Sequence, residues 1–382
     1  MMSKDDRDAA LSLYLHVPFC VRKCRYCDFT SLTAGPGRIG EYFLTLRSEL
    51  ADAGDDVRYA GRTVRTIYVG GGTPTCVEVS QIVRMMELVR ELFAIDPDAE
   101  ISIECNPGSA DLNKLRAYRD AGINRLSIGC QSMIDGELRL LGRVHDSADF
   151  LRTYEDARTV GFDNVNVDLM SAIPGQKLSD LEYSLRKVCE LGPEHVSAYS
   201  LQLEEGTYLY EHQDEYEFVD EDLDREMYHV TADVLRDHGY ERYEISNYSR
   251  PGRECRHNLT YWTGGDYLGM GLGAASLTDG VRHKNTDDLL RYLSGERTVE
   301  SIPLSVNDGM EEYMFLGLRL MRGVSRSGFK ARFGVSMDEI YAGVIADMTS
   351  KGMLSSSGNG DVIRLTEAGL DVCNYVLSGF IL

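Results

Sequence analysis

The stretch LYLHVPFCVRKCRYC (13–27) joins a strand-like run to three cysteines in a C-x3-C-x2-C arrangement. Three thiolates this close in one loop can converge on a single metal centre. A tetrahedral zinc site needs a fourth ligand, which no Cys or His at a suitable downstream spacing supplies, and His16 lies within the preceding strand. A [4Fe–4S] cluster held by three thiolates keeps one iron open. We therefore predict that Cys20, Cys24 and Cys27 bind such a cluster, with a zinc-binding structural protein as a rival interpretation.

The whole chain has the composition of a folded protein. Its 382 residues suggest two or three domains, and its 43% hydrophobic and 26% charged side chains exclude disorder. No run of about 18 apolar residues is present to cross a membrane, and the opening MMSKDDRDAA lacks a secretory h-region. The net charge of 40 − 61 = −21 argues against nucleic-acid binding. Nine cysteines, an odd number, indicate a reducing compartment, so we expect a cytoplasmic protein.

Strand-like and helical runs alternate through the first half of the chain. The amphipathic helical runs cover 38–52, 78–94, 110–121, 147–160 and 178–191, and the strand-like runs cover 13–17, 64–70, 100–105, 124–129, 164–170 and 194–200. Six strand-then-helix units predict an α/β fold with a parallel sheet, open or curled into a partial barrel. They do not reach the eight units of a complete barrel, which takes about 250 residues.

The pattern divides the chain into three expected regions, 1–210, 211–304 and 305–382. In the middle region, a helix over 222–238 and a strand over 240–246 precede a glycine-rich stretch, 263–280, which we expect to be irregular loop. The last region contains helical runs at 310–321, 326–333 and 337–350, followed by a small hairpin and a final helix. This order predicts a mainly helical, winged-helix-like domain. Because it lacks a basic recognition helix, a structural role is favoured over DNA binding.

The cysteine triplet after a first strand resembles the radical S-adenosylmethionine (SAM) superfamily, whose partial (β/α)6 barrel matches the six units. The resemblance implies that the open iron binds the amino and carboxylate groups of SAM. GGGTPT (70–75) follows the second strand and resembles the glycine motif that binds the SAM amino group in that superfamily. Glycines allow close backbone approach to a ligand, although alone they could form a simple turn. We take Gly71, Gly72 and Thr73 as SAM-binding candidates.

Polar residues also stand at later strand ends. Glu104, Gln131 and Asp168 close or follow the third, fourth and fifth strands, and Arg143 follows the fourth unit. The pattern is similar to the coproporphyrinogen III oxidase-like branch, where matching positions hold SAM. The resemblance adds Tyr14 and Tyr26 as SAM contacts. A further SAM contact of that branch, after the sixth strand, is not carried over, because SAYSLQLEEGT differs locally.

Two features choose between members of this branch. The oxidases carry a fourth cysteine two residues beyond the third, where this chain has Phe29, which disfavours oxidase activity. HNLTYW (257–262) matches the HNxxYW motif of the HemW family of heme chaperones, and imidazole is a common axial ligand of heme iron. His257 is therefore the candidate heme ligand, with Cys255 ranked below it.

The resemblance to HemW-family heme chaperones implies a [4Fe–4S] cluster, SAM and heme as cofactors. It also implies recipient hemoproteins of the respiratory chain or a heme store as partners, with membrane association only through them, and it leaves a homodimer open. Two alternatives remain: an oxygen-independent coproporphyrinogen III oxidase, and another radical SAM enzyme acting on tetrapyrroles. Whether the chain is an enzyme stays open at this point.

Overall fold

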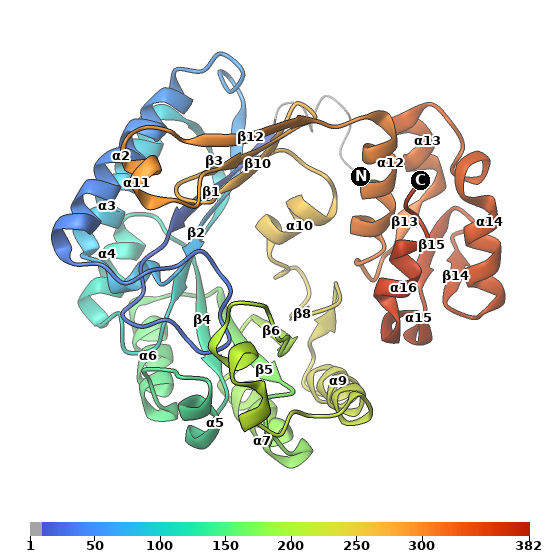
Figure 1. Ribbon diagram of the computed structural model, residues 1–382, viewed down its shortest axis with the longest axis horizontal. Helices are drawn as coiled ribbons and strands as arrows, with labels where there is room; N and C mark the ends of the chain where they lie inside the picture. The colour runs from blue at the N-terminus through green and yellow to red at the C-terminus, as the bar shows by residue number, and fades with distance from the viewer. Residues whose placement is uncertain (1–9) are drawn as a thin grey trace.

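Six parallel strands form the curved centre of the molecule (Figure 1). The computed structural model describes residues 10–382, so nearly all of the polar opening stretch that we read for a secretory signal lies outside the described residues. The predicted α/β fold and all six predicted strands are confirmed, in the order β1 (Ala10–Val17), β2 (Thr63–Gly71), β3 (Ala94–Cys105), β4 (Arg125–Gln131), β5 (Val165–Ser171) and β6 (His195–Ser200).

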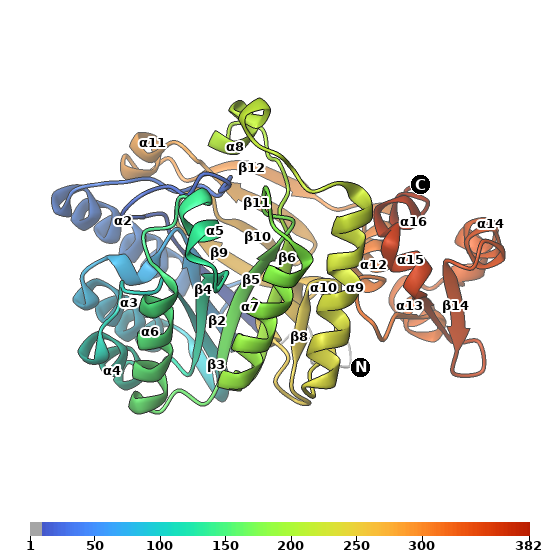
Figure 2. The ribbon, with the colours of Figure 1, turned by 90° about the horizontal axis from the view of Figure 1, so that it is seen from below.

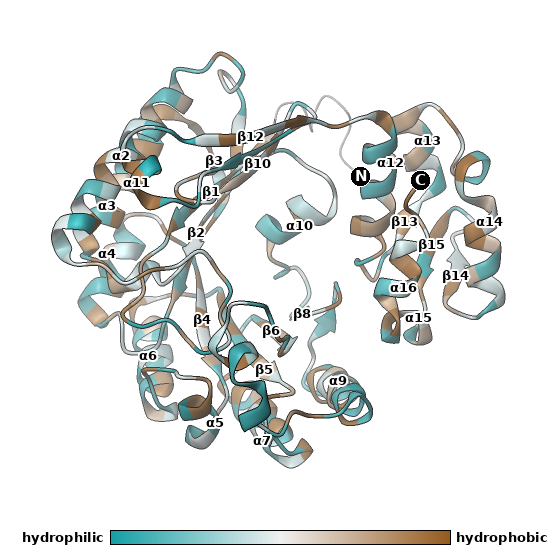
Figure 3. Cartoon of the chain, viewed as in Figure 1, coloured by the Kyte–Doolittle hydropathy of each residue, from teal (hydrophilic) through white to brown (hydrophobic). Residues whose placement is uncertain are grey.

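The predicted helices cover the outer face of this sheet. They are α2 (Pro36–Gly54), α3 (Val79–Leu92), α4 (Leu112–Asp120), α6 (Ser147–Val160) and α7 (Leu178–Leu191). These helices carry brown and teal positions in alternation along their length, as amphipathic helices do (Figure 3). A short helix after β4, α5 (Asp135–Leu140), was not predicted. Outward-facing Leu13, Ile67 and Ile103 are fully buried or nearly so beneath the helical layer.

The sheet continues beyond both edges of the six-strand core with strands from the middle of the chain. Next to β1 lie β9 (Tyr267–Met270), β10 (Ala275–Thr278), β11 (Val281–Asn285) and β12 (Thr298–Pro303), and next to β6 lie β8 (Asn247–Ser249) and β7 (Glu241–Arg242). The expectation of irregular loop over 263–280 is therefore wrong. The pairing of β9 with β1 is parallel and distant in sequence, so local glycine content could not reveal it. The strand expected over 240–246 is confined to β7.

The inner face of the curved sheet is polar, because inward positions on neighbouring strands carry hydroxyls, carboxyls and amides. On β1 and β2, the Ser12 hydroxyl accepts from the Thr66 hydroxyl at 2.8 Å. On β4 and β5, Asn166 donates to the Ser127 hydroxyl at 2.8 Å and to Asp168 Oδ1 at 2.7 Å. Alternation along a strand thus separates an apolar outer face under the helices from a polar interior. Helix α10 (Arg256–Trp262) lies on the concave side of the sheet (Figure 1).

The C-terminal domain has its own apolar core, which includes Phe329, Tyr341 and Ile363. It comprises α12 (Val306–Gly317), β13 (Val324–Ser325), α13 (Arg326–Phe333), α14 (Met337–Ser350), the hairpin β14 (Leu354–Ser357) and β15 (Val362–Leu365), and α15 (Glu367–Asp371) and α16 (Cys373–Ser378). The domain stands to one side of the sheet, beyond α9 (Glu221–Asp237) and α10 (Figure 2). Across residues 10–382, no helix combines the length and the apolar character needed to span a bilayer.

Candidate functional site

One pocket opens at the carboxyl ends of the parallel strands, where the loop after β1 meets the loops after β2, β3 and β4. It encloses about 720 Å³ of empty space, part of which is open to solvent. Active sites gather at this end of a parallel sheet because loops from several strands converge there. Eleven of the thirteen predicted site residues line this pocket: Cys20, Cys24, Tyr26, Cys27, Gly71, Gly72, Thr73, Glu104, Gln131, Arg143 and Asp168.

Backbone hydrogen bonds tie the glycine loop to the cysteine loop. Gly72 N donates to Val17 O at 2.9 Å, and Thr73 N donates to Phe19 O at 2.7 Å. The Thr73 hydroxyl lies 3.5 Å from the Cys20 sulfur. These contacts hold Cys20 next to Gly72 and Thr73, which we predicted to contact SAM.

Gly71 is required by geometry. Its φ of +118° is open to glycine, and a Cβ atom at this position would lie 2.5 Å from the His16 ring. With no side chain in the way, its backbone N–H reaches the Glu104 Oε2 atom at 3.0 Å. The glycine motif therefore shapes a backbone surface that any side chain would block.

Two half-buried carboxyl groups, those of Glu104 and Asp168, face the pocket from β3 and β5. Burial, followed by the nearby charge of Asp168, raises the pKa of Glu104 to about 7. Glu104 accepts hydrogen bonds from Tyr68 Oη at 3.1 Å and from the Gly71 N–H. Burial also raises the pKa of Asp168. Among residues 10–382, neither carboxyl group has a salt-bridge partner within 4 Å, so both are available to a cationic ligand.

Arg143 supplies the positive charge on the opposite wall. Its Nη2 donates to Gly129 O at 2.7 Å and to Asn106 Oδ1, and its Nη1 lies 3.4 Å from Tyr26 Oη and 3.5 Å from the Cys24 sulfur. Its buried Nε has no hydrogen-bond partner among residues 10–382. The guanidinium is therefore fixed beside the second cysteine, where its charge suits an anionic ligand or a metal-bound thiolate.

The three cysteines of the loop are free, half-buried thiols. Burial raises the pKa of the Cys20 thiol and raises the pKa of Cys27 to about 11. Soft thiolate donors suit iron–sulfur clusters, and a metal drives such thiols to ionise. In the part of the chain that the structure describes, no three Cys, His, Asp or Glu side chains already share metal-binding geometry. The donor chemistry fits a cluster, and the thiols have to turn toward one another to hold it.

Tyr14 and His257 do not line the pocket. The Tyr14 hydroxyl lies 3.0 Å from His16 Nδ1, deeper within the barrel. His257 is only 1% exposed, with Nδ1 2.8 Å from the Thr66 hydroxyl and Nε2 2.8 Å from Tyr261 Oη. Burial, together with the charge of Arg125, lowers the pKa of His257 to about 3. The imidazole is thus neutral, and both of its nitrogens are already engaged.

Sequence reasoning missed several residues that line the pocket, among them Asn106, Ser127 and Gly129. Ser127 and Gly129 precede the predicted Gln131 by four and two residues on β4. Asn106 likewise follows Glu104 by two residues. All three residues stand two or four positions from a predicted residue, so the two-residue period of a strand predicts that they share its face.

Two family models and several relatives match this chain. The model described as the radical SAM superfamily matches residues 14–188, and the model of the HemN C-terminal domain matches residues 304–372. The heme chaperone HemW of Bacillus subtilis is 34% identical to this chain, over 97% of this chain and 99% of its own length. The heme chaperone HemW of Escherichia coli is 35% identical, over 97% of this chain and 98% of its own length.

A solved structure shares nearly the whole architecture. Coproporphyrinogen III oxidase (HemN) of Escherichia coli, described as a radical SAM enzyme, superimposes with a TM-score of 0.87 at 25% sequence identity. The match covers 98% of this chain and 90% of that chain. The likeness spans both the strand core and the C-terminal domain.

Proposed function

The chain belongs to the HemW family of heme chaperones within the radical SAM superfamily, and from this premise we propose that it binds a [4Fe–4S] cluster, SAM and heme and delivers the heme to apo-hemoproteins. Respiratory enzymes or a heme store are the recipients in this proposal, and the cytoplasm is the compartment. The observation that carries the proposal is the shared pocket, where eleven predicted residues from five strands and the loops that follow them meet.

In this proposal Cys20, Cys24 and Cys27 hold the cluster. When bound, the cluster supplies one-electron redox chemistry and an open iron for SAM. The chain's own contribution is to position the thiolates and to balance their charge. Arg143 Nη1 lies 3.5 Å from the Cys24 sulfur, where its positive charge can balance a metal-bound thiolate, and the Thr73 hydroxyl can donate to the Cys20 sulfur.

SAM carries an amino group, a sulfonium and a carboxylate, so a site for it needs both signs of charge. Glu104 and Asp168 provide two half-buried carboxyl groups for the cationic part, and Arg143 provides a guanidinium for the carboxylate. Gly71 and Gly72 allow the ligand to approach the backbone, while Tyr26 and Gln131 complete the wall. Tyr14 acts from behind this wall, through its contacts with His16 and the Tyr68 ring.

Heme ligation by His257 belongs to the proposal as a prediction. Because Thr66 and Tyr261 occupy both ring nitrogens, ligation requires His257 to lose one of these two hydrogen bonds. The neutral state of the buried imidazole suits an axial ligand, which binds iron through an unprotonated nitrogen.

Heme titration of the anaerobically reconstituted protein tests the proposed function. We expect saturable binding of heme and its passage to an apo-hemoprotein, and we expect His257→Ala to weaken the binding. Unchanged titration of His257→Ala would remove the ligand assignment but leave the chaperone function standing. Absence of heme binding would overturn the chaperone function itself.

The likeness to coproporphyrinogen III oxidase keeps that enzyme as a second candidate. In the same preparation, coproporphyrinogen III, SAM and a reductant would yield protoporphyrinogen if the chain were an oxidase. Because Phe29 stands where the oxidases carry a fourth cysteine, we expect no such product.

A further inference from the structure

Three large apolar side chains stand exposed around the cysteine loop. Val21 is 71% exposed, Phe29 is 62% exposed, and Val144, in the loop between α5 and α6, is 49% exposed. Val21 and Phe29 come from the cysteine loop itself, whereas Val144 comes from a separate segment. Single exposed apolar residues are common, but a group of them beside a pocket is typical of a surface that binds an apolar ligand.

Two cations lie within the same group. Arg22 Nη2 donates to the carbonyl oxygens of Gly142 and Arg143, both at 2.8 Å, and Lys23 Nζ donates to Phe29 O at 3.3 Å. Carbonyl oxygens position these cations without neutralising them. Within the described chain, neither Arg22 nor Lys23 has a carboxylate within 4 Å, although the protein as a whole carries a net charge of −21.

The group spans two adjoining hollows. Arg22 lines the pocket described above and also a second hollow, which Val21, Val144 and Pro107 border. The second hollow also contains Asp149, whose carboxylate pairs with Arg152 and caps α6 through Asp146 N. The carboxylate of this second hollow is thus already engaged. We call the resulting surface the rim strip; it consists of Val21, Arg22, Lys23, Phe29 and Val144.

We propose that heme docks on the rim strip, with its porphyrin face against Val21, Phe29 and Val144 and its two propionates on Arg22 and Lys23. The proposal rests on the proposed heme-binding function and gives it a location distinct from His257. Heme is a flat apolar ring with two carboxylates at one edge, and the rim strip offers apolar contacts beside two cations without carboxylate partners. This placement gives heme a first docking position at the mouth of the cluster pocket while His257 on α10 keeps its hydrogen bonds to Thr66 and Tyr261. Ligation by His257 is then a separate, later step.

Heme titration of reconstituted protein variants tests the rim strip. Reversing both charges in Arg22→Glu/Lys23→Glu is expected to raise the heme Kd about tenfold, because two ion pairs with the propionates are lost and replaced by repulsion. Since these residues lie between cluster ligands, iron content is measured in the same sample. Val144→Asp, outside the cysteine loop, is expected to raise the Kd about threefold or more by placing a charge in the apolar surface.

The matched control is Val57→Ser/Arg116→Glu, which changes an 84% exposed valine and an exposed arginine away from the rim strip. It is expected to bind heme like wild type. Heme dimethyl ester, which lacks both carboxylates, is expected to bind wild type about tenfold more weakly than heme and to show no further loss in Arg22→Glu/Lys23→Glu.

Two results would overturn the rim strip. One is wild-type heme affinity in both Arg22→Glu/Lys23→Glu and Val144→Asp, and the other is equal affinity of wild type for heme and its dimethyl ester. If wild type itself binds no heme, the proposed function fails instead, so the two failures are distinguishable. A loss confined to His257→Ala, with rim-strip variants unaffected, would place heme at α10 and refute the rim strip alone.

Discussion

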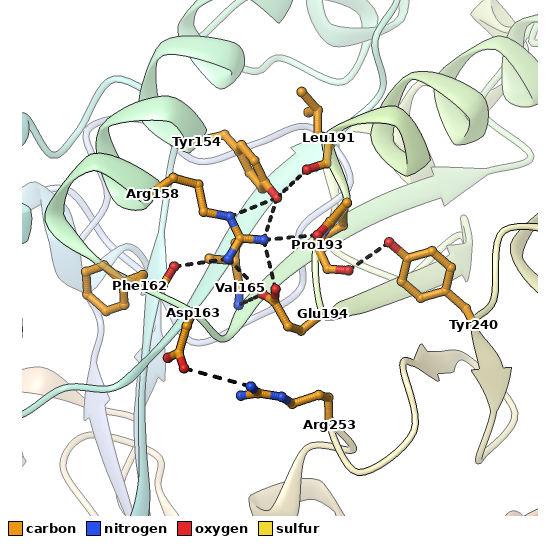
Figure 4. A network of polar contacts seen from close by, with 11 residues as sticks. Tyr154, Arg158, Phe162, Asp163, Val165, Leu191, Pro193, Glu194, Tyr240 and Arg253 are labelled. Atoms are coloured by element: carbon orange, nitrogen blue, oxygen red, sulfur yellow. Dashed lines mark hydrogen bonds and ion pairs between the residues drawn. The ribbon is translucent and has the colours of Figure 1, made fainter.

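Charged groups are paired within the protein at the amino end of the barrel, whereas two carboxyl groups at its carboxyl end have no ion-pair partner in the described part of the chain. At the amino end, Arg158 on α6 bonds Tyr154 Oη, Phe162 O, Gly192 O and both oxygens of Glu194 (Figure 4). At the carboxyl end, Glu104 and Asp168 have no ion-pair partner within the described residues. Burial raises the pKa of both.

The comparison indicates that the polar groups at the amino end stabilise the fold, whereas those at the carboxyl end are available to bind a ligand. Polar groups that satisfy one another tie α6, α7, β5 and β6 together, since Glu194 also accepts from Val165 N at 2.9 Å and the Tyr240 hydroxyl donates to Pro193 O at 2.7 Å. At the carboxyl end, the carboxyl groups and thiols have no ionic partner among the described residues, so they can form ionic or metal bonds with a ligand. Desolvated ionisable groups of this kind are typical of functional sites.

The largest effect is expected from breaking the carboxyl end. Cys20→Ser/Cys24→Ser/Cys27→Ser should lose essentially all cluster iron and iron–sulfur absorbance, because the loop then has no thiolate donors. Far-UV circular dichroism should remain that of wild type. Cys373→Ser, in the C-terminal domain, serves as the control and should retain its iron. Full iron in the triple variant would refute the ligand assignment.

Removing the Arg158 contacts at the amino end should lower the free energy of unfolding and leave the pocket at the carboxyl end unchanged. Arg158→Ala leaves the Glu194 carboxylate partly buried without its cation, so we expect a loss of about 2 to 3 kcal/mol in the free energy of unfolding. Chemical denaturation measures this loss. Arg186→Ala removes an exposed pair with Glu182 on α7 and should change stability by less than about 0.5 kcal/mol. An equal loss in both variants would contradict the comparison.

Glu104→Gln should weaken SAM binding about tenfold, since a neutral amide attracts a cation less than a carboxylate does. With a pKa of about 7, Glu104 is roughly one-tenth ionised at pH 6 and roughly nine-tenths ionised at pH 8, so wild-type SAM affinity should rise between these values. Isothermal titration at both pH values measures this rise. Glu87→Gln, on the outer surface of α3, should keep the wild-type dependence. Persistence of the full rise in Glu104→Gln would rule out Glu104 as its source.

The smallest effect concerns a single hydrogen bond at the amino end. Tyr240→Phe removes the donor to Pro193 O and should lower the free energy of unfolding by about 1 kcal/mol without altering SAM affinity. Thermal and chemical denaturation measure the first quantity, and titration measures the second. A change in SAM affinity would show that the two ends are coupled.

Local sequence patterns predicted the six strands and most of the pocket, because hydrophobic periodicity and strand-end polar residues are local signals. They did not predict β9 and β10, because these strands join the sheet through β1, which lies far away in the sequence. A Cβ on Gly269 would lie 2.1 Å from Ala275 O, so glycine here permits a tight hairpin. Nor did they predict the burial of His257, since Thr66 lies 191 residues away and meets it only in the folded barrel.

The central claim is that one pocket at the carboxyl end holds both the cluster and SAM. Electron paramagnetic resonance of the reduced, reconstituted protein with and without saturating SAM tests it directly. The account predicts that SAM changes the cluster spectrum of wild type and of Arg158→Ala, and that Glu104→Gln requires more SAM for the same change. A wild-type spectrum that saturating SAM leaves unaltered would contradict the account.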